Sequence, residues 1–592
     1  MKIGRTLRTL QHLRPTQVVG RAKRVITSRL DASRPHWWVS RVQAGADATL
    51  RASWRPQWPQ TPRPLAQPML DDSKPIVCGQ NLQTSLLEVN FDAEHLSALA
   101  QVNLHAFHFL PTSFERPDQA RAVVDAWIAR YPPTVQPAWS PWCIARRVPG
   151  WLRLLSCHPD VGDEQRLQSL GRQVEALSTR IEFDLQGNHL WDDAVALYLA
   201  GLALDSKRSS AWQATGKRLL HQAIVKQVLP CGGHAERSVM YHCSLLVGLL
   251  ELMAGLEVAG QPDVVVSECA DSMARWLERI LPLSGADPEF NDAVAGLYPT
   301  AHQVLTAAWR AGLGSASIEP EHTDNLDGWA LSRQGSHYLL LDAADVGLDE
   351  QPGHAHADTL CLDWRVAGQP ILVDPGIAEY AADPHRAWSR STRAHGVLTL
   401  GDLDSAEVWH TFRVGRRPQD VQSHGPRPVA VPVGQAWSMT GSHDGYRHLT
   451  GAPIVRREVM VWWLDDINAL LWIADSVDGL PVEMTSRMTF SSELQLDADQ
   501  IRGAASGGWL AFGFDEHQLA QGRVSGGVGS WKSAPVVVGR GTSRHSGWVL
   551  SVGDKVQTAR ESAEVEVAWQ GKMIASLPSP DTPHSQRVWS LC

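Results

Sequence analysis

The sequence has little cysteine and no long apolar run. Its eight cysteines are scattered without a CxxC pair, so the pattern indicates neither a disulfide framework nor a thiolate zinc site, and we expect mostly buried, small apolar side chains. No segment approaches the length of a membrane span, and the basic segment Met1–Leu30 has no apolar core of a signal peptide. These absences predict no integral membrane segment and a cytoplasmic location.

A large excess of one charge sign is also missing. The 592 residues carry 54 Lys and Arg against 63 Asp and Glu, a formal charge of −9, which disfavours non-specific binding to nucleic acid or to an anionic membrane. The composition, 43% hydrophobic and 20% charged, is typical of globular proteins, and the length predicts at least two domains. Tryptophan is abundant, with 25 residues, which suits sugar stacking as well as core packing.

The first half of the chain has helical periodicity. Apolar residues recur at three and four positions from about Asp118 to Gly314, and the run Ser244–Gly260 is typical of one helix ended by a glycine. Serial helices without intervening strands indicate a bundle or a closed ring of helical hairpins. We therefore expect a helical domain at residues 86–318, after an arm at residues 1–85 that is basic and rich in Pro and Trp.

The composition changes around residues 312–328, which are rich in Gly, Ser, Pro and Asp and are typical of a linker. Short alternating runs bounded by turn residues follow, and one pair of them indicates a hairpin closed at Asp465–Asn468. No long helical pattern interrupts these runs. The second half, residues 327–592, is therefore predicted to be an antiparallel β-sandwich.

Two polar clusters lie in the helical half. In GNHLWDD, which starts at Gly187, Asn188 is in position to cap a helix, and the acidic pair would complement the helix dipole. In GGHAERSVMYH, a helix from about His234 would put Arg237 and Tyr241 at i and i+4 on one face. A cation there would lower the tyrosine pKa from about 10. An amphipathic helix with a surface ion pair explains the second pattern equally well.

The densest cluster lies in the second half, in PGHAHAD (Pro352–Asp358), LVDPG (Leu372–Gly376) and RSTRAH (Arg390–His395). In an extended segment, His354 and His356 would point to one face. Two histidines and a carboxylate suit a catalytic or structural zinc site, although histidines that only form hydrogen bonds in a turn give the same pattern. A metallo-β-lactamase site would need a histidine after Asp358, where the chain has Thr359.

Together, these clusters resemble the heparinase II/III family of polysaccharide lyases, which includes relatives that act on alginate. The matching stretches occur in family order between Gly187 and Arg417, and they are GNHLWDDAVALYLAGL, GGHAERSVMYH, EFNDAVAG, QPGHAHADTLCLDWRVAGQPILVDPGIAEYAADPHRAWSRSTRAHGVLTL and FRVGRR. The resemblance implies an incomplete α/α toroid followed by an antiparallel β-sandwich. It also implies a lyase whose partner is an acidic polysaccharide or oligosaccharide, acting in surface polysaccharide turnover or biosynthesis, with the periplasm or cell envelope as an alternative location.

The family's chemistry is β-elimination, in which a base removes the C5 proton of a uronic acid and the bond from C4 to the glycosidic oxygen breaks. By resemblance, Asn188 neutralises the sugar carboxylate with His354 nearby. Tyr241 matches the catalytic tyrosine, and His189 matches a second base of some members. The sequence leaves open which of the two removes the proton. Three further residues are expected to assist at the site: Tyr380, Glu236 and Arg237.

His356, Asp374 and His395 match the family's zinc-binding positions. The spacing from His356 to Asp374 suits two neighbouring strands joined by a turn. The resemblance implies a structural Zn²⁺ at the rim of the sandwich, where it would hold His354 in place. One departure concerns the residue after the last histidine, which is commonly Asn in relatives and is Gly396 here.

Two other functions stay open at this point. A glycoside hydrolase of the same toroid architecture would use two of the carboxylates of Asp192, Asp193 and Glu236 and would release saturated products. A non-catalytic factor in polysaccharide binding or export would keep the site for binding alone. The sequence does not indicate the polymer, endo or exo action, or the oligomeric state.

Overall fold

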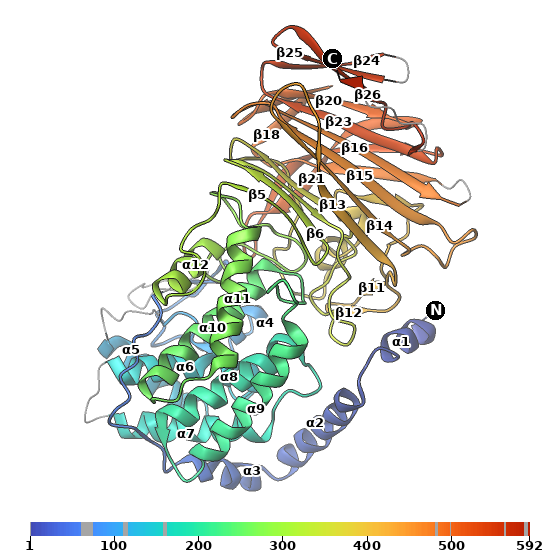
Figure 1. Cartoon of the computed structure of the whole chain (residues 1–592). Helices are drawn as coiled ribbons and strands as arrows, with labels where there is room; N and C mark the ends of the chain where they lie inside the picture. The colour runs from blue at the N-terminus through green and yellow to red at the C-terminus, as the bar shows by residue number, and fades with distance from the viewer. Residues whose placement is uncertain are drawn as a thin grey trace.

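The computed structural model describes residues 2–60, 75–110, 117–157, 163–479, 483–497, 499–561, 564–584 and 590–591. A helical half precedes a sheet-rich half along the chain, and the two lie end to end (Figure 1). This order confirms the predicted fold class, helices followed by antiparallel sheets. The last helix of the helical half ends at Arg310 and the first strand of the sheet-rich half begins at Glu321.

The helical half is built around α8, which is buried along almost its whole length. Its neighbour α9 approaches closely because Gly216 has no side chain, and a Cβ there would collide with the backbone N of Tyr198 in α8. The helices of this half are α1 (Lys2–Leu10), α2 (Pro15–Ser33), α3 (Pro35–Val42), α4 (Ala98–Ala106), α5 (Pro117–Arg130), α6 (Pro141–Cys157), α7 (Glu164–Thr179), α8 (Gly187–Ala203), α9 (Ser209–Gln227), α10 (Val239–Val258), α11 (Val264–Ile280) and α12 (Ala301–Arg310).

The helix α10 is the most apolar of these. In the part of the chain that the structure describes, it is the one helix long and apolar enough to cross a membrane, by length and composition only. This corrects the expectation that no segment approaches a membrane span. Since 78% of its most apolar window is buried inside the protein, α10 also meets the description of an ordinary core helix.

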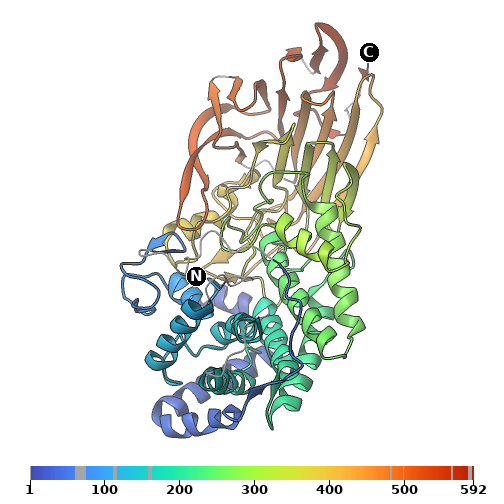
Figure 2. The same cartoon turned by 90° about the vertical axis from the view of Figure 1, so that its left-hand side faces the viewer.

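The N-terminal arm is more ordered than its composition suggested. Its first part forms α1, α2 and α3, which run along the outside of the molecule (Figure 1), and Figure 2 shows the N-terminus at the level where the two halves meet. The Pro- and Trp-rich part that follows contains β1 (Thr49–Leu50), and Trp54 and Trp58 are buried. Residues 61–74 of this arm lie outside the described residues.

All strand pairs in the described part of the sheet-rich half are antiparallel. The predicted hairpin at Asp465–Asn468 is confirmed, because β15 (Ile454–Trp463) pairs with β16 (Ala469–Asp478) across it. The eight-stranded sheet has the order β13-β14-β15-β16-β23-β20-β19-β18, and its neighbour has the order β10-β17-β22-β21. Ser486 of β17 links the two, since it donates to Asp475 of β16 and accepts from Trp548 of β23.

The strands of these two sheets are β13 (Val421–Val429), β14 (Gln435–His443), β18 (Leu494–Asp497), β19 (Gln500–Gly503), β20 (Gly507–Phe512), β23 (His545–Val552), β10 (Leu398–Leu400), β17 (Met484–Thr489), β21 (Glu516–Ser525) and β22 (Trp531–Gly541), besides β15 and β16. Smaller sheets contain β5 (Glu321–Leu326), β6 (Trp329–Gln334), β7 (His337–Asp342), β8 (Leu362–Val366) and β9 (Gln369–Leu372); β24 (Val556–Glu561), β25 (Glu564–Trp569), β26 (Lys572–Pro578) and β27 (Ser590–Leu591); and the pairs β1 with β4 (Leu204–Asp205), β2 (Ile76–Val77) with β3 (Gln80–Asn81), and β11 (Val408–Trp409) with β12 (Arg413–Val414).

The sheet β5–β9 fastens the two halves together at the C-terminal end of α11. Arg333 of β6 donates to the backbone oxygens of Arg279, Leu281 and Glu278, and the Tyr338 hydroxyl of β7 donates to that of Ile280 at 2.7 Å. The last carbonyls of a helix have no partner within it, so these side chains satisfy groups that burial would otherwise leave unpaired. The loops beside this junction carry the candidate site.

Candidate active site

The first predicted cluster lies at the start of α8, but Asn188 is not the N-cap. Gln186 occupies that position with a φ of 59°, and Asn188 lies inside the helix. Asp192 and Asp193 lie beyond the first turn, so the predicted complement to the helix dipole is wrong as well. Asn188 is buried, and its side-chain Oδ1 has no hydrogen-bond partner among the described residues. Its amide is therefore free to bind a ligand, which a capping side chain would not be.

His189 and Glu236 lie on either side of Asn188. Although burial lowers the pKa of His189, the carboxylate of Glu182, with Oε2 2.8 Å from His189 Nδ1, raises it above the ordinary value. The Oε1 atom of Glu236 accepts a hydrogen bond from the backbone N–H of Asn188 at 3.3 Å, and burial raises the pKa of this carboxyl. The start of α8 thus combines an unpaired amide and an imidazole of raised pKa with the buried carboxyl of Glu236.

The second predicted cluster is not helical where we expected. α10 begins at Val239, and its N-cap Ser238 accepts a hydrogen bond from the backbone N–H of Tyr241 at 3.4 Å. Arg237 has a φ of 56°, so Arg237 and Tyr241 do not lie at i and i+4 of one helix, and that prediction is wrong. The backbone oxygen of Arg237 accepts a hydrogen bond from Asn291, and the tyrosine pKa is raised instead of lowered.

Tyr241 lies among other rings at the junction of the two halves. Its hydroxyl donates to the Tyr380 hydroxyl at 3.1 Å, and its ring stacks on that of His354 with centroids 3.9 Å apart. Burial, together with the neighbouring Tyr380, Tyr298 and Asp292, raises the pKa of Tyr241 well above its ordinary value. The structure therefore brings Tyr241, His354 and Tyr380 together, and Tyr241 carries its proton at neutral pH.

Asp292 connects the helical half to both predicted histidines. Its Oδ2 lies 2.8 Å from His354 Nδ1, and its Oδ1 lies 2.9 Å from His356 Nε2. Arg386 of α13 (Pro384–Ser389) donates to both oxygens, with Nη2 2.7 Å from Oδ2. Although burial raises the pKa of Asp292, the Arg386 guanidinium holds it well below its usual range. The two histidines thus face one permanently charged carboxylate, which fixes the orientation of both rings.

The predicted zinc ligands lie close together, with two further neighbours. Asp374 Oδ2 lies 2.7 Å from His395 Nδ1 and accepts a hydrogen bond from Cys361 Sγ at 3.2 Å. Ligand atoms lie within 4.8 Å of one another in two overlapping groups, His356 with Asp358 and His395, and Cys361 with Asp374 and His395. Three buried atoms have no hydrogen-bond partner in the described chain: His356 Nδ1, Asp358 Oδ2 and His395 Nε2. Such atoms need a cation or a donor, so these residues fit a zinc ion.

Three functional candidates were not singled out by the sequence, namely Asp292, Arg386 and Cys361. Asp292 and Arg386 lie within matching stretches of the family resemblance, but nothing in their spacing indicates that they form an ion pair. Cys361 was expected to be a passive apolar side chain, and the hairpin of β8 and β9 brings Asp374 back to it. The structure describes six further cysteines, which are free, while Cys592 lies outside the described residues.

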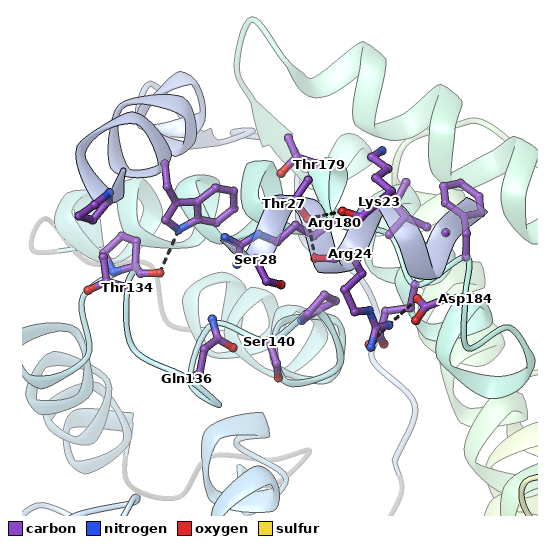
Figure 3. Close-up of a pocket in the computed structure, with 18 residues that line it drawn as sticks. Lys23, Arg24, Thr27, Ser28, Thr134, Gln136, Ser140, Thr179, Arg180 and Asp184 are labelled. Carbon is purple, nitrogen blue, oxygen red and sulfur yellow. Dashed lines mark hydrogen bonds and ion pairs between the residues drawn. The ribbon is translucent and has the colours of Figure 1, made fainter. Parts of the chain in front are cut away.

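A cavity of about 540 Å³ lies beside this site, between α2, α3 and the loops before α6 and α8. Figure 3 shows Ser28 of α2 on one side of it and Gln136 and Ser140 on the other. Glu182 lines this cavity and also contacts His189, so this side chain belongs to both the cavity and the candidate site. The lining combines polar side chains such as Gln136 with the apolar ring of Trp38.

Comparison with known proteins agrees with the geometry in both halves. Two family profiles match, the heparinase II/III N-terminus at residues 127–308 and the heparinase II/III-like C-terminal domain at residues 326–570. A heparin-sulfate lyase of Pedobacter heparinus is 26% identical over 260 residues. This match covers 40% of the chain and 38% of that relative, well short of its full length.

Solved structures share the fold over a larger part of the chain. The crystal structure of heparinase III has a TM-score of 0.63 at 15% sequence identity, covering 94% of this chain and 91% of that one. The crystal structure of heparan sulfate lyase HepC from Pedobacter heparinus has a TM-score of 0.53 at 17% identity, covering 85% and 86%. At such low identities, these likenesses establish the shared fold.

Proposed function

The chain belongs to the heparinase II/III family, and from this premise we propose that it is a polysaccharide lyase that cleaves an acidic, uronic-acid-containing polysaccharide by β-elimination. The observation that carries this proposal is the assembly of Tyr241, His354 and Asp292 at the junction of the two halves. Glu236 connects this assembly to the start of α8, because it lies within electrostatic reach of His354 and accepts a hydrogen bond from the backbone N–H of Asn188.

The proposed reaction has four linked changes. A base takes the proton from C5 of the uronic acid, and the electron pair of that C–H bond becomes the C4–C5 double bond. The bond from C4 to the glycosidic oxygen breaks, and the departing oxygen receives a proton from an acid. Negative charge accumulates on the sugar carboxylate as the C5 proton leaves, so groups that stabilise this charge accelerate the step.

Tyr241 is proposed as the acid that protonates the departing oxygen. Its raised pKa means that it holds its proton until a strongly basic oxygen develops beside it. His189 is proposed as the base, because Glu182 makes its imidazole more basic than usual. After turnover, water would reprotonate Tyr241 through Tyr380, which accepts the Tyr241 hydrogen bond, and His189 would release the C5 proton to water.

Asn188 and His354 are proposed to bind the sugar carboxylate, and Glu236 is proposed to hold Asn188 in position. The Asn188 side-chain amide lacks a partner among the described residues, and Glu236 Oε1 accepts a hydrogen bond from the Asn188 backbone N–H at 3.3 Å. His354 is held by Asp292 through Nδ1, which leaves its other ring nitrogen for the substrate. Arg237 is not proposed to touch the substrate.

A structural zinc ion is proposed to be held by His356, His395 and a carboxylate, with Cys361 beside them. When bound, it would supply rigidity to the loops that carry His354, and none of the proton transfers requires it. Elemental analysis of the purified protein should find zinc, and His356→Ala should remove the metal and lower the melting temperature. Comparing Asp358→Asn with Asp374→Asn then identifies the carboxylate ligand, because only the ligand's loss reduces zinc content.

Ultraviolet absorbance during incubation with a panel of uronate polymers tests the lyase proposal, because elimination creates a conjugated double bond. Tyr241→Phe should abolish the rise on polymers, while Tyr446→Phe, which removes a hydroxyl that donates to the backbone oxygen of Leu403, should leave it intact. A 4-fluoro uronide separates the roles, since fluoride needs no proton on leaving. Tyr241→Phe should still turn over this substrate, whereas His189→Gln should not.

The hydrolase alternative predicts new reducing ends without an absorbance rise. It is less favoured because Asp193 is fully buried and accepts the backbone N–H of Glu182 at 2.8 Å, and Asp192 forms an ion pair with Arg146. Glu236 is then the remaining carboxylate of the three. If neither signal appears on any polymer while the protein still binds them, a binding or export role replaces the lyase proposal.

A further inference from the structure

The N-terminal helices form a surface that the proposed lyase reaction does not use. Residues 1–42 contain ten Lys and Arg and a single acidic residue, Asp31, in a chain whose formal charge is −9. The chain is weakly acidic overall, but its N-terminal segment is strongly basic. The argument from net charge against an anionic membrane applies to the remainder of the chain and not to these helices.

One side of α2 attaches this segment to the protein. Gln17 is 2% exposed and donates to the backbone oxygen of Glu350 at 3.0 Å. Two turns of helix later, Arg24 pairs with Asp184 at 2.6 Å and with Glu182. These contacts fix which face of α2 points inward, and Figure 3 shows this face above the cavity.

The opposite side of α2 is apolar and exposed. Val18, Val19 and Ile26 are 55%, 67% and 58% exposed, and Val25 and Leu30 are also open to solvent. Helical spacing places all five on one continuous arc, which we call the α2 apolar arc. A soluble surface helix usually has polar residues on this face, so the arc needs an explanation.

Basic side chains accompany the α2 apolar arc. Lys23 and Arg29 are exposed, and neither forms an ion pair within the described part of the chain. The neighbouring helices also carry exposed apolar side chains, Leu7 and Leu10 of α1 and Trp37 of α3, which is half exposed. Figure 1 shows that α1 and α2 run along one flank of the molecule and that α3 lies at the lower end of the helical half.

We propose that the α2 apolar arc and its basic neighbours form a docking surface for an anionic lipid bilayer. A helix with one apolar face and Lys and Arg beside it lies in the headgroup region, with the apolar side chains among the acyl chains. An acidic polysaccharide would use the positive charges but not the valines. A second copy of the chain would bring two strongly basic helices together, which their charges oppose. An anionic bilayer offers negative headgroups to the basic side chains and acyl chains to the apolar ones.

Co-sedimentation of the whole protein with phosphatidylcholine vesicles, with and without phosphatidylglycerol, tests this inference. We expect binding to the anionic vesicles, weaker at high salt, and little binding to phosphatidylcholine alone. The double variant Val19→Glu, Ile26→Glu should reduce binding by at least about tenfold. Arg29→Gln should also weaken it, and more so at low salt.

The controls are substitutions of the same kind elsewhere on the surface. Val225→Glu changes an 82% exposed valine on α9, and Lys572→Gln removes an exposed charge on β26; both should bind vesicles as the unchanged protein does. Circular dichroism verifies that each variant is folded. Equal binding by the double variant, or absence of binding to anionic vesicles, would overturn the proposal. The proposal would also be overturned if the protein bound no vesicles and instead dimerised with rising concentration, and if the double variant abolished this dimerisation.

Discussion

Arg457 and Asp475 form a fully buried ion pair between β15 and β16, two adjacent strands of the large sheet, and we predict that Arg457→Met is strongly destabilising. The guanidinium contacts Asp475 with Nε 2.7 Å and Nη2 2.9 Å from the two carboxylate oxygens, and both side chains are 0% exposed. Its Nη1 also donates to the backbone oxygens of Leu360 and Gly396, which precede Cys361 and follow His395. One side chain therefore supports both the sheet and the loops of the proposed zinc site.

The magnitude follows from these contacts. Removing one partner of a buried ion pair costs about 3–5 kcal/mol, because the other charge stays buried without compensation. Each carbonyl left without its donor adds roughly 1 kcal/mol. We therefore expect Arg457→Met to lower the free energy of unfolding by at least about 4 kcal/mol. The double variant Arg457→Met, Asp475→Leu should recover part of this loss, because no unpaired charge remains.

Urea unfolding followed by circular dichroism and tryptophan fluorescence measures the loss. Arg447→Met, which breaks the exposed pair with Asp444, serves as the matched control and should leave the unfolding midpoint nearly unchanged. If Arg457→Met cost less than about 1 kcal/mol, or if the double variant were no more stable than the single one, the assignment of this pair as a support of both loops would be refuted.

Three further predictions concern other parts of the chain. Hydrogen bonds from Arg8 lower the pKa of Glu407 to about 2. The ion pair that attaches α1 should therefore be fully formed at pH values above the usual carboxyl pKa and should weaken as the pH falls toward about 2. Glu407→Gln should speed hydrogen exchange in α1 at neutral pH. Gly216→Ala should lower the stability of the protein by about 1–3 kcal/mol, because the added Cβ meets the α8 backbone. The control is Gly248→Ala on α10, whose Cβ would lie 3.7 Å from Val195 Cγ1 and should leave the melting temperature unchanged or raise it. Asp292→Asn should lower turnover of a uronate polymer by about 10–100-fold without loss of fold, and unchanged turnover would contradict its orienting role.

Local pattern was sufficient where neighbours in sequence decide the structure. The helical periodicity before Gly314 and the alternation after residue 327 predicted the order of the two halves, and the turn at Asp465–Asn468 predicted its hairpin. Pattern was insufficient at helix starts. A residue with positive φ precedes each of two helices, Gln186 before α8 and Arg237 before α10, and the chain turns there. Neither glutamine nor arginine favours that backbone conformation. The caps expected at Asn188 and the helical face expected for Arg237 were wrong for that reason.

The sequence by itself determined the fold class, the family and the residue types available for chemistry, because periodicity and motif order are properties of short stretches. The tertiary structure decided which of those residues meet. Asp292, His354 and Arg386 are distant in sequence, and only the junction of the two halves puts one carboxylate between a guanidinium and two imidazoles. The same holds for the tyrosine pKa, which depends on burial among Tyr380, Tyr298 and Asp292 and not on the nearby Arg237. Electrostatic environment arises from three-dimensional neighbours, and a linear pattern does not contain them.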